Sequence, residues 1–96
     1  MNIILAHNDY DAAHLAEVKA EMQSMGAPTV KAVWMEGYGA YVALEGCHRL
    51  RAAHDLGLTP QVIEVDYSDE AADTDLECVT IAEHCDSAYR REMLEF

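Results

Sequence analysis

The feature that most constrains this chain is a strand-like apolar run that ends at a glycine and leads directly into a helix-forming segment. The run closes at Glu45-Gly46, and a helix is expected from Cys47 to about Leu56, where Gly57 ends it. A glycine has no Cβ, so a ligand can approach its backbone closely. The N–H groups and the positive dipole end of a helix start attract anions. The pattern therefore indicates a phosphate-binding turn at this glycine.

The side chains of this expected helix divide into two groups. Arg49 lies in the first turn, where its guanidinium can make a forked contact with phosphate oxygens. Helical spacing predicts an inward face formed by Leu50, Ala53 and Leu56. The side chains expected to turn towards solvent are Arg49, Arg51 and Asp55.

The rest of the chain predicts strands and two more helices. One helix is expected to begin after Asp11, a residue type that caps helix starts, and to end at Gly26, shortly before Pro28. Its apolar positions include Val18 and Met22, and Glu21 is expected on the opposite, polar side. The expected strands are 3–5, 30–35, 41–44 and 61–65, the middle two joined as a hairpin.

Two further segments carry specific expectations. Alternation in the strand 30–35 predicts one face formed by Val30, Ala32 and Trp34 and another by Lys31 and Val33. Trp34, Tyr38 and Tyr41 are interpreted as packing within the hairpin. The segment 76–93 is expected to be helical, as part of an acidic extension over 71–96. The whole pattern predicts a single α/β (α+β) domain over residues 1–96, a small mixed sheet with packed helices.

Composition excludes several classes of protein. The chain has six Lys and Arg residues against eighteen acids, a net charge of −12, so it is not expected to bind DNA by itself. No apolar run is long enough for a membrane span, and no secretory signal is evident. The three cysteines, an odd number, are expected to be reduced thiols of a cytoplasmic protein. Cys78, His84 and Cys85 lack the paired spacing of a zinc site, so no metal site is expected.

The segment Gly46-Cys47-His48-Arg49 resembles a known signature. It is similar, residue for residue, to the Gly-Cys-His-Arg turn of sulfiredoxins, and the continuation Leu50-Arg51-Ala52-Ala53 is similar to that of ParB proteins. The resemblance to this ParB/sulfiredoxin superfamily covers about residues 1–70 and implies its mixed α/β fold. The chain departs from the family in having no helix-turn-helix domain, no Arg-Pro near the start, and Glu17 where sulfiredoxins carry an ATP-binding lysine.

The resemblance implies a nucleotide of the ATP or CTP type, with Mg²⁺, as the ligand. The residues that it implies for nucleotide and phosphate binding are Gly46, Cys47, His48, Arg49, Asp9 and Tyr10. Cys47 would be the nucleophile of a sulfiredoxin-like reaction, and Glu45 would be the general base of a kinase-like one or a metal-nucleotide contact. Cys47 can also be a packed residue tolerated in a phosphate turn, so whether the protein is an enzyme stays open. The alternative function is a non-catalytic protein-interaction module with an acidic surface, binding a protein partner or a second copy of itself.

Overall fold

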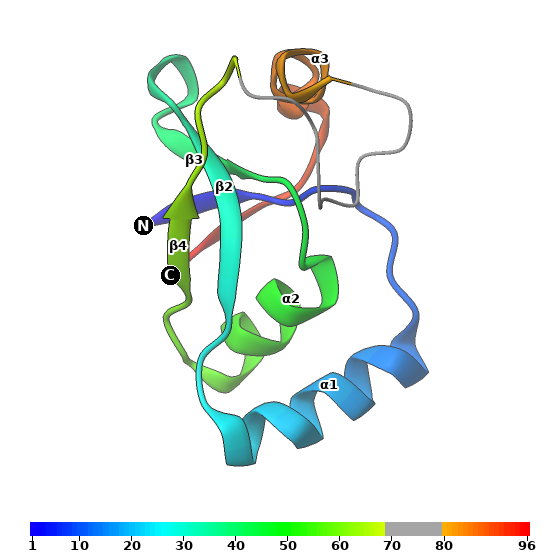
Figure 1. The fold of residues 1–96 in the computed structure, drawn as a ribbon. Helices are drawn as coiled ribbons and strands as arrows, with labels where there is room; N and C mark the ends of the chain where they lie inside the picture. Colours follow the sequence, from blue (N-terminus) through cyan, green and yellow to red (C-terminus); the bar gives the residue numbers. More distant parts are fainter. Residues whose placement is uncertain (69–79) are drawn as a thin grey trace.

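The computed structural model describes residues 1–68 and 80–96, which form a mixed sheet with helices packed on both sides (Figure 1). In chain order, the elements are β1 (Asn2–Ile4), α1 (Ala12–Met25), β2 (Thr29–Met35), a 3-10 helix (Glu36–Tyr38), β3 (Ala40–Ala43), α2 (Cys47–Leu56), β4 (Gln61–Glu64), α3 (Ile81–Asp86), a second 3-10 helix (Ala88–Arg90) and β5 (Met93–Glu95). The α/β fold class expected from the sequence is confirmed.

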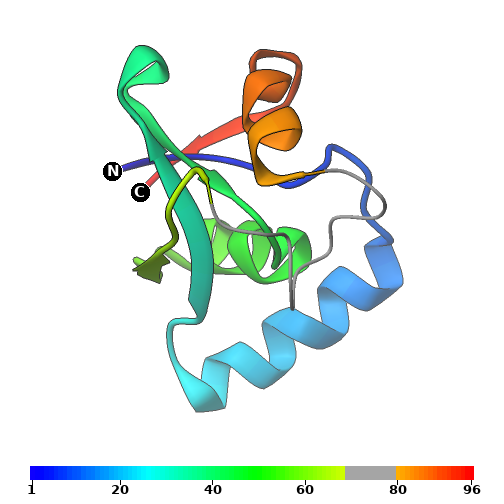
Figure 2. The same cartoon turned by 45° about the horizontal axis from the view of Figure 1, so that its top comes forward.

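The strands lie in the order β4-β2-β3-β1-β5. β2 and β3 form the expected antiparallel hairpin, whereas β1 runs parallel to β3 and β4 runs parallel to β2. Figures 1 and 2 show α1 and α2 side by side, with α3 apart from them. The chain termini lie next to each other because β5 pairs antiparallel with β1.

Both faces of the sheet contribute to the core, and neighbouring residues of one strand point to opposite faces. Ile3 and Leu50 of α2 belong to one buried cluster, and Ile4 packs with Ile81 of α3 in another. The first cluster holds Ile3, Leu5, Val30, Ala43, Cys47 and Leu50. The second holds Ile4, Val33, Ala40, Val42, Leu44, Ile81, Cys85 and Ala88. The sheet is therefore covered by α2 on one side and by α3 on the other.

This double covering explains why both faces of strand 30–35 carry buried side chains. Val30 is buried in the α2 cluster and Val33 in the α3 cluster, so the two lie on opposite faces, as the alternation predicted. Trp34 shares the α2 side but remains 44% exposed. Its ring packs edge-to-face on Tyr41 with the centroids 5.1 Å apart, within the hairpin. A strand that is buried on both faces has no single apolar side, so alternation alone cannot predict its orientation.

The end of the chain also differs from the expected helix over 76–93. Residues 76–79 lie outside the described part, α3 ends at Asp86, and the chain closes as the strand β5. Arg91 anchors the segment between these elements by donating to the Leu5 carbonyl at 2.7 Å and to the His84 carbonyl at 3.0 Å. The imidazole of His84 lies 2.9 Å from the Ala43 carbonyl of β3. The free edge of β1 offers unpaired backbone groups, and β5 satisfies them.

No helix in the part of the chain described by the structure is long and apolar enough to cross a membrane.

If α3 completes the core, shortening its main buried side chain must destabilise the fold. We expect Ile81→Ala to lower the free energy of unfolding by about 2–5 kcal/mol, because it leaves a cavity in a fully buried site. The matched control is Tyr89→Ala, at a side chain that is 66% exposed, where the change should stay within about 0.5 kcal/mol. Urea unfolding followed by circular dichroism measures both, and equal effects would contradict this role of α3.

Candidate functional site

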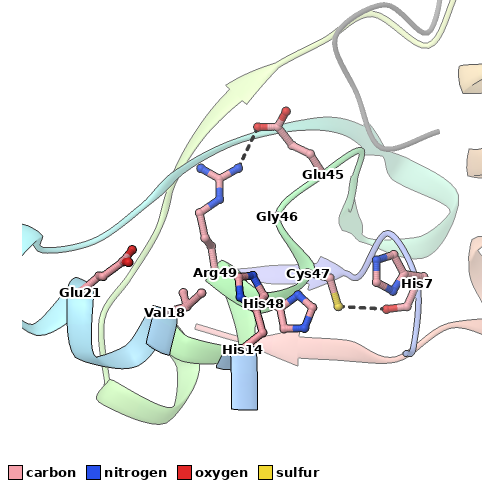
Figure 3. Close-up of a pocket in the computed structure, with 9 residues that line it drawn as sticks. All are labelled: His7, His14, Val18, Glu21, Glu45, Gly46, Cys47, His48 and Arg49. Atoms are coloured by element: carbon pink, nitrogen blue, oxygen red, sulfur yellow. Dashed lines mark hydrogen bonds and ion pairs between the residues drawn. The ribbon is translucent and has the colours of Figure 1, made fainter. Parts of the chain in front are cut away.

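A cavity of about 370 Å³ lies at the N-terminal end of α2, between that helix and α1 (Figure 3). The residues that line it are His7, His14, Val18, Glu21, Glu45, Gly46, Cys47, His48 and Arg49. Five of these, Glu45 to Arg49, are the turn that the sequence singled out. The other four come from the loop after β1 and from α1.

Gly46 gives this turn its shape. Its φ of 75° is in the left-handed region, and a Cβ there would lie 2.9 Å from Cγ1 of the buried Val30 and 3.2 Å from Nη2 of Arg49. No side chain in the described part of the chain caps α2, and its first helical bond runs from Leu50 N to Gly46 O at 2.8 Å. The first-turn N–H groups that precede this bond have no acceptor within the helix. The cavity is therefore bordered by the positive end of a helix.

Arg49 folds back over Gly46 and is held by two acceptors. Its Nη2 donates to Oε1 of Glu45 at 3.0 Å, and its Nη1 donates to the Thr29 carbonyl at 3.0 Å. The guanidinium remains partly exposed, so a ligand in the cavity can reach it. Glu45 balances the charge of Arg49 in this arrangement.

His48 is oriented by the start of α1. Its Nε2 accepts a hydrogen bond from the backbone N–H of Asp11 at 2.9 Å, and its ring meets the edge of His14 with the centroids 4.6 Å apart. Burial lowers the pKa of His48, and the nearby His14 and His7 lower it further. The hydrogen bond from Asp11 N–H requires an unprotonated Nε2, so the neutral imidazole with its proton on Nδ1 is the form that fits this contact.

Cys47 is buried, with 2% of its surface exposed. Its Sγ lies 3.3 Å from the His7 carbonyl and 3.5 Å from the Asp9 carbonyl and donates to them as a thiol. These contacts join the first residue of α2 to the loop after β1. Figure 3 shows the sulfur directed at His7.

Arg51 corrects the expectation of a solvent-facing side chain, because only 12% of it is exposed. Its Nη2 donates to Glu92 at 2.6 Å and to the Asn8 carbonyl at 2.9 Å, and its guanidinium lies 4.4 Å from the centre of the Tyr10 ring. Burial acts to lower the pKa of Arg51, but hydrogen bonds to Glu92 and Cys47 outweigh it and raise the pKa. Helical spacing could not predict this burial, since the groups that cover Arg51 come from remote segments.

Asp9 and Tyr10 lie near the turn without lining the cavity. Asp9 contacts Cys47 through its carbonyl, and Tyr10 stacks on Arg51. Glu17, which stands at the position of the sulfiredoxin lysine, is not a lining residue either and pairs with His14 at 3.8 Å.

The sequence analysis missed the wall of the cavity that α1 provides. His14, Val18 and Glu21 are separated by four and three residues, the spacing of one helical face. Glu21 was expected on the side away from Val18, and both line the cavity. The polar residues His14 and Glu21, which lie on the same helical face as Val18, were the sequence signal that could have predicted this wall. Among residues 1–68 and 80–96, no group of three or more His, Cys, Asp or Glu side chains is arranged to hold a metal ion.

Comparisons of the chain with protein-family models, with curated proteins and with solved structures found no match. The resemblance to the ParB/sulfiredoxin superfamily therefore stays a prediction, based on the residues of the turn.

Gly46 and Gly57 form a matched pair for testing the turn. Both have positive φ angles, 75° and 72°, but a Cβ at Gly57 would meet nothing within 4 Å. We expect Gly57→Ala to cost about 1–2 kcal/mol of stability from backbone strain alone. Gly46→Ala adds a clash with Val30 and should cost about 2–4 kcal/mol in total. Equal losses in denaturant unfolding would show that the space at Gly46 is not restricted.

The thiols offer a test of sulfiredoxin-like chemistry. Because Cys47 and Cys85 are buried, we expect both to react slowly with iodoacetamide in the native state and rapidly after unfolding. Burial also raises the pKa of Cys85 to about 11, which makes it an internal standard for an inert thiol. Mass-spectrometric mapping separates these sites from Cys78. Labelling of Cys47 in the native protein as fast as a free thiol would instead support a nucleophile.

Proposed function

We propose that this protein binds the phosphate groups of a nucleotide at the N-terminus of α2. The observation that carries the proposal is the coincidence of the Gly46 turn, the helix end without a side-chain cap and Arg49 around one cavity. Backbone N–H groups at such an end hold phosphate oxygens in many unrelated proteins. Arg49 adds a guanidinium, the only one among the described residues that line the cavity.

The neutral His48 supports the same ligand. Because its Nε2 accepts from Asp11, its Nδ1–H is the ring group left to donate. A fixed neutral donor suits a phosphate oxygen, which only accepts hydrogen bonds. The volume of about 370 Å³ is within the range of small-molecule sites.

The carboxylates of Glu21 and Glu45 are the side chains of the cavity that could bind the proposed Mg²⁺. Both line the cavity and would repel a polyphosphate by themselves. Mg²⁺ is commonly held by one or two carboxylates together with nucleotide phosphates and waters, so either Glu21 or Glu45 could supply one such ligand. When bound, the ion would neutralise charge between these side chains and the phosphates.

The contacts favour nucleotide binding over sulfinic-acid reduction. A reductase needs an accessible thiolate, whereas Cys47 is buried and its sulfur donates to carbonyl oxygens. Glu45 is the carboxylate that a kinase-like reaction would use, and it is bonded to Arg49. We therefore propose binding as the function, with Glu45 as the residue that would carry any phosphoryl-transfer chemistry.

One observation favours the alternative of a protein-interaction module. Trp34 is large, apolar and substantially exposed on the sheet, in a chain with a net charge of −12. Exposed aromatic side chains are common anchors of protein interfaces. A basic partner would complement the charge, and its binding would change the fluorescence of Trp34, the single tryptophan of the chain.

A thermal-shift series with ATP, CTP, GTP and ADP, each with and without Mg²⁺, tests the nucleotide proposal. At 100 times its dissociation constant, a ligand adds about 2.7 kcal/mol of stability. For a domain of about 100 residues this corresponds to a rise in Tm on the order of 10 °C. We expect such a rise with one nucleotide, larger in Mg²⁺. No shift with any nucleotide, combined with nucleotide-independent capture of a single protein partner, would favour the interaction module.

The role of Arg49 can be measured with the nucleotide that gives the largest shift. We expect Arg49→Ala to weaken binding by about 1.5–3 kcal/mol, the range for a hydrogen bond to a charged group, with the fold intact. Arg90→Ala is the control, since Arg90 is exposed and stacks on Tyr89 outside the cavity. Equal affinities of wild type and Arg49→Ala in calorimetry would remove Arg49 from the site.

A further inference from the structure

The contact between His48 and the start of α1 depends on a single proton. The backbone N–H of Asp11 donates to Nε2 of His48 at 2.9 Å, so this nitrogen must be free of hydrogen. The side chain of Asp11 is already engaged, accepting from the His14 N–H at 2.9 Å as the N-cap of α1. A proton on Nε2 would place two N–H groups against each other and break the contact.

The surroundings of His48 offer little to stabilise its charged form. Within residues 1–68 and 80–96, the titratable groups that act on it are His14 and Asp11 at the start of α1, His7 in the loop after β1, and Arg51 on α2 itself. Asp11 is the one acid among these described groups, and the other three are basic side chains. The charged form of His48 is thus disfavoured as long as α1 is docked.

We propose that His48 is a proton-sensitive latch, which in its neutral form fastens the start of α1 to α2 and on protonation releases it. The contact that opens lies beside His14, which lines the cavity, so acid would loosen the α1 wall at this point. The hydrogen bonds of Cys47 to His7 and of Arg51 to Asn8 do not depend on this proton and keep the loop before Asp11 in place. The latch is independent of the proposed nucleotide function, since it follows from contacts within the chain.

The direction of the pH dependence follows from burial and the basic neighbours. The pKa of His48 is lowered below its ordinary value of 6.5 in the docked state. The released state therefore binds the proton more readily, and its population grows as pH falls below about 6.5. Growth is at most about tenfold per pH unit and stops below the lowered pKa. At pH values well above 6.5 the contact no longer depends on pH, because His48 is neutral in both states.

NMR spectroscopy can measure the protonation of the His48 ring and the hydrogen exchange of the Asp11 amide directly. Long-range ¹H–¹⁵N correlations of the His48 ring at pH 7.5 should show a proton on Nδ1 and none on Nε2. The hydrogen-exchange protection factor of the Asp11 amide should fall by about tenfold or less between pH 7.5 and 5.5. A local readout is needed because the pKa of buried His84 is also lowered and would affect global stability in the same range.

Two variants separate loss of the acceptor from loss of titration. His48→Gln places an amide oxygen near the position of Nε2, so protection at Asp11 should remain and become independent of pH over this range. His48→Ala removes the acceptor, and protection should be low at both pH values. A proton on Nε2 in the wild type at pH 7.5 would overturn the proposal, even if neither variant folds. The same pH dependence at Asp11 in wild type and His48→Gln would also overturn it.

Discussion

The loop at residues 7–11 is fastened to the first two turns of α2, and the position of α1 depends on this attachment. Cys47, His48 and Arg51 each bond to a backbone atom of the loop: the His7 carbonyl, the Asp11 N–H and the Asn8 carbonyl. The loop leads directly into α1, so the same contacts set where α1 starts. Since α1 and α2 form opposite walls of the cavity, these three hydrogen bonds define its shape.

The side chains of the turn at residues 46–49 contact two different parts of the structure, the loop at residues 7–11 and the strand β2. Cys47 and His48 point to the loop, whereas Arg49 points to β2, where it bonds to Thr29 and passes close to Gly46. With these side chains engaged, the backbone N–H groups and the partly exposed guanidinium become the main groups that an anion can meet. A phosphate site built in this way relies on the helix end more than on individual side chains.

The ends of α1 and α2 could be predicted from the sequence, because they are determined by a few neighbouring residues. Asp11 and Gly26 marked the ends of α1, and Gly46 and Gly57 marked those of α2, because caps and positive φ angles are properties of short segments. Features decided by remote contacts were missed. Arg51 is covered by Glu92, 41 residues away, and β5 forms on an edge supplied by the first strand. The α1 wall of the cavity likewise required knowing which helix face meets α2.

The central claim, that the start of α2 binds phosphate, is tested most directly by titrating ¹⁵N-labelled protein with inorganic phosphate and then with Mg²⁺-ATP. The account predicts that the largest amide shifts occur at Cys47, His48 and Arg49, because their N–H groups would meet the anion. Saturable shifts should be absent with an equal concentration of chloride. Shifts confined to other parts of the chain, or no saturable shifts at these three amides, would contradict it.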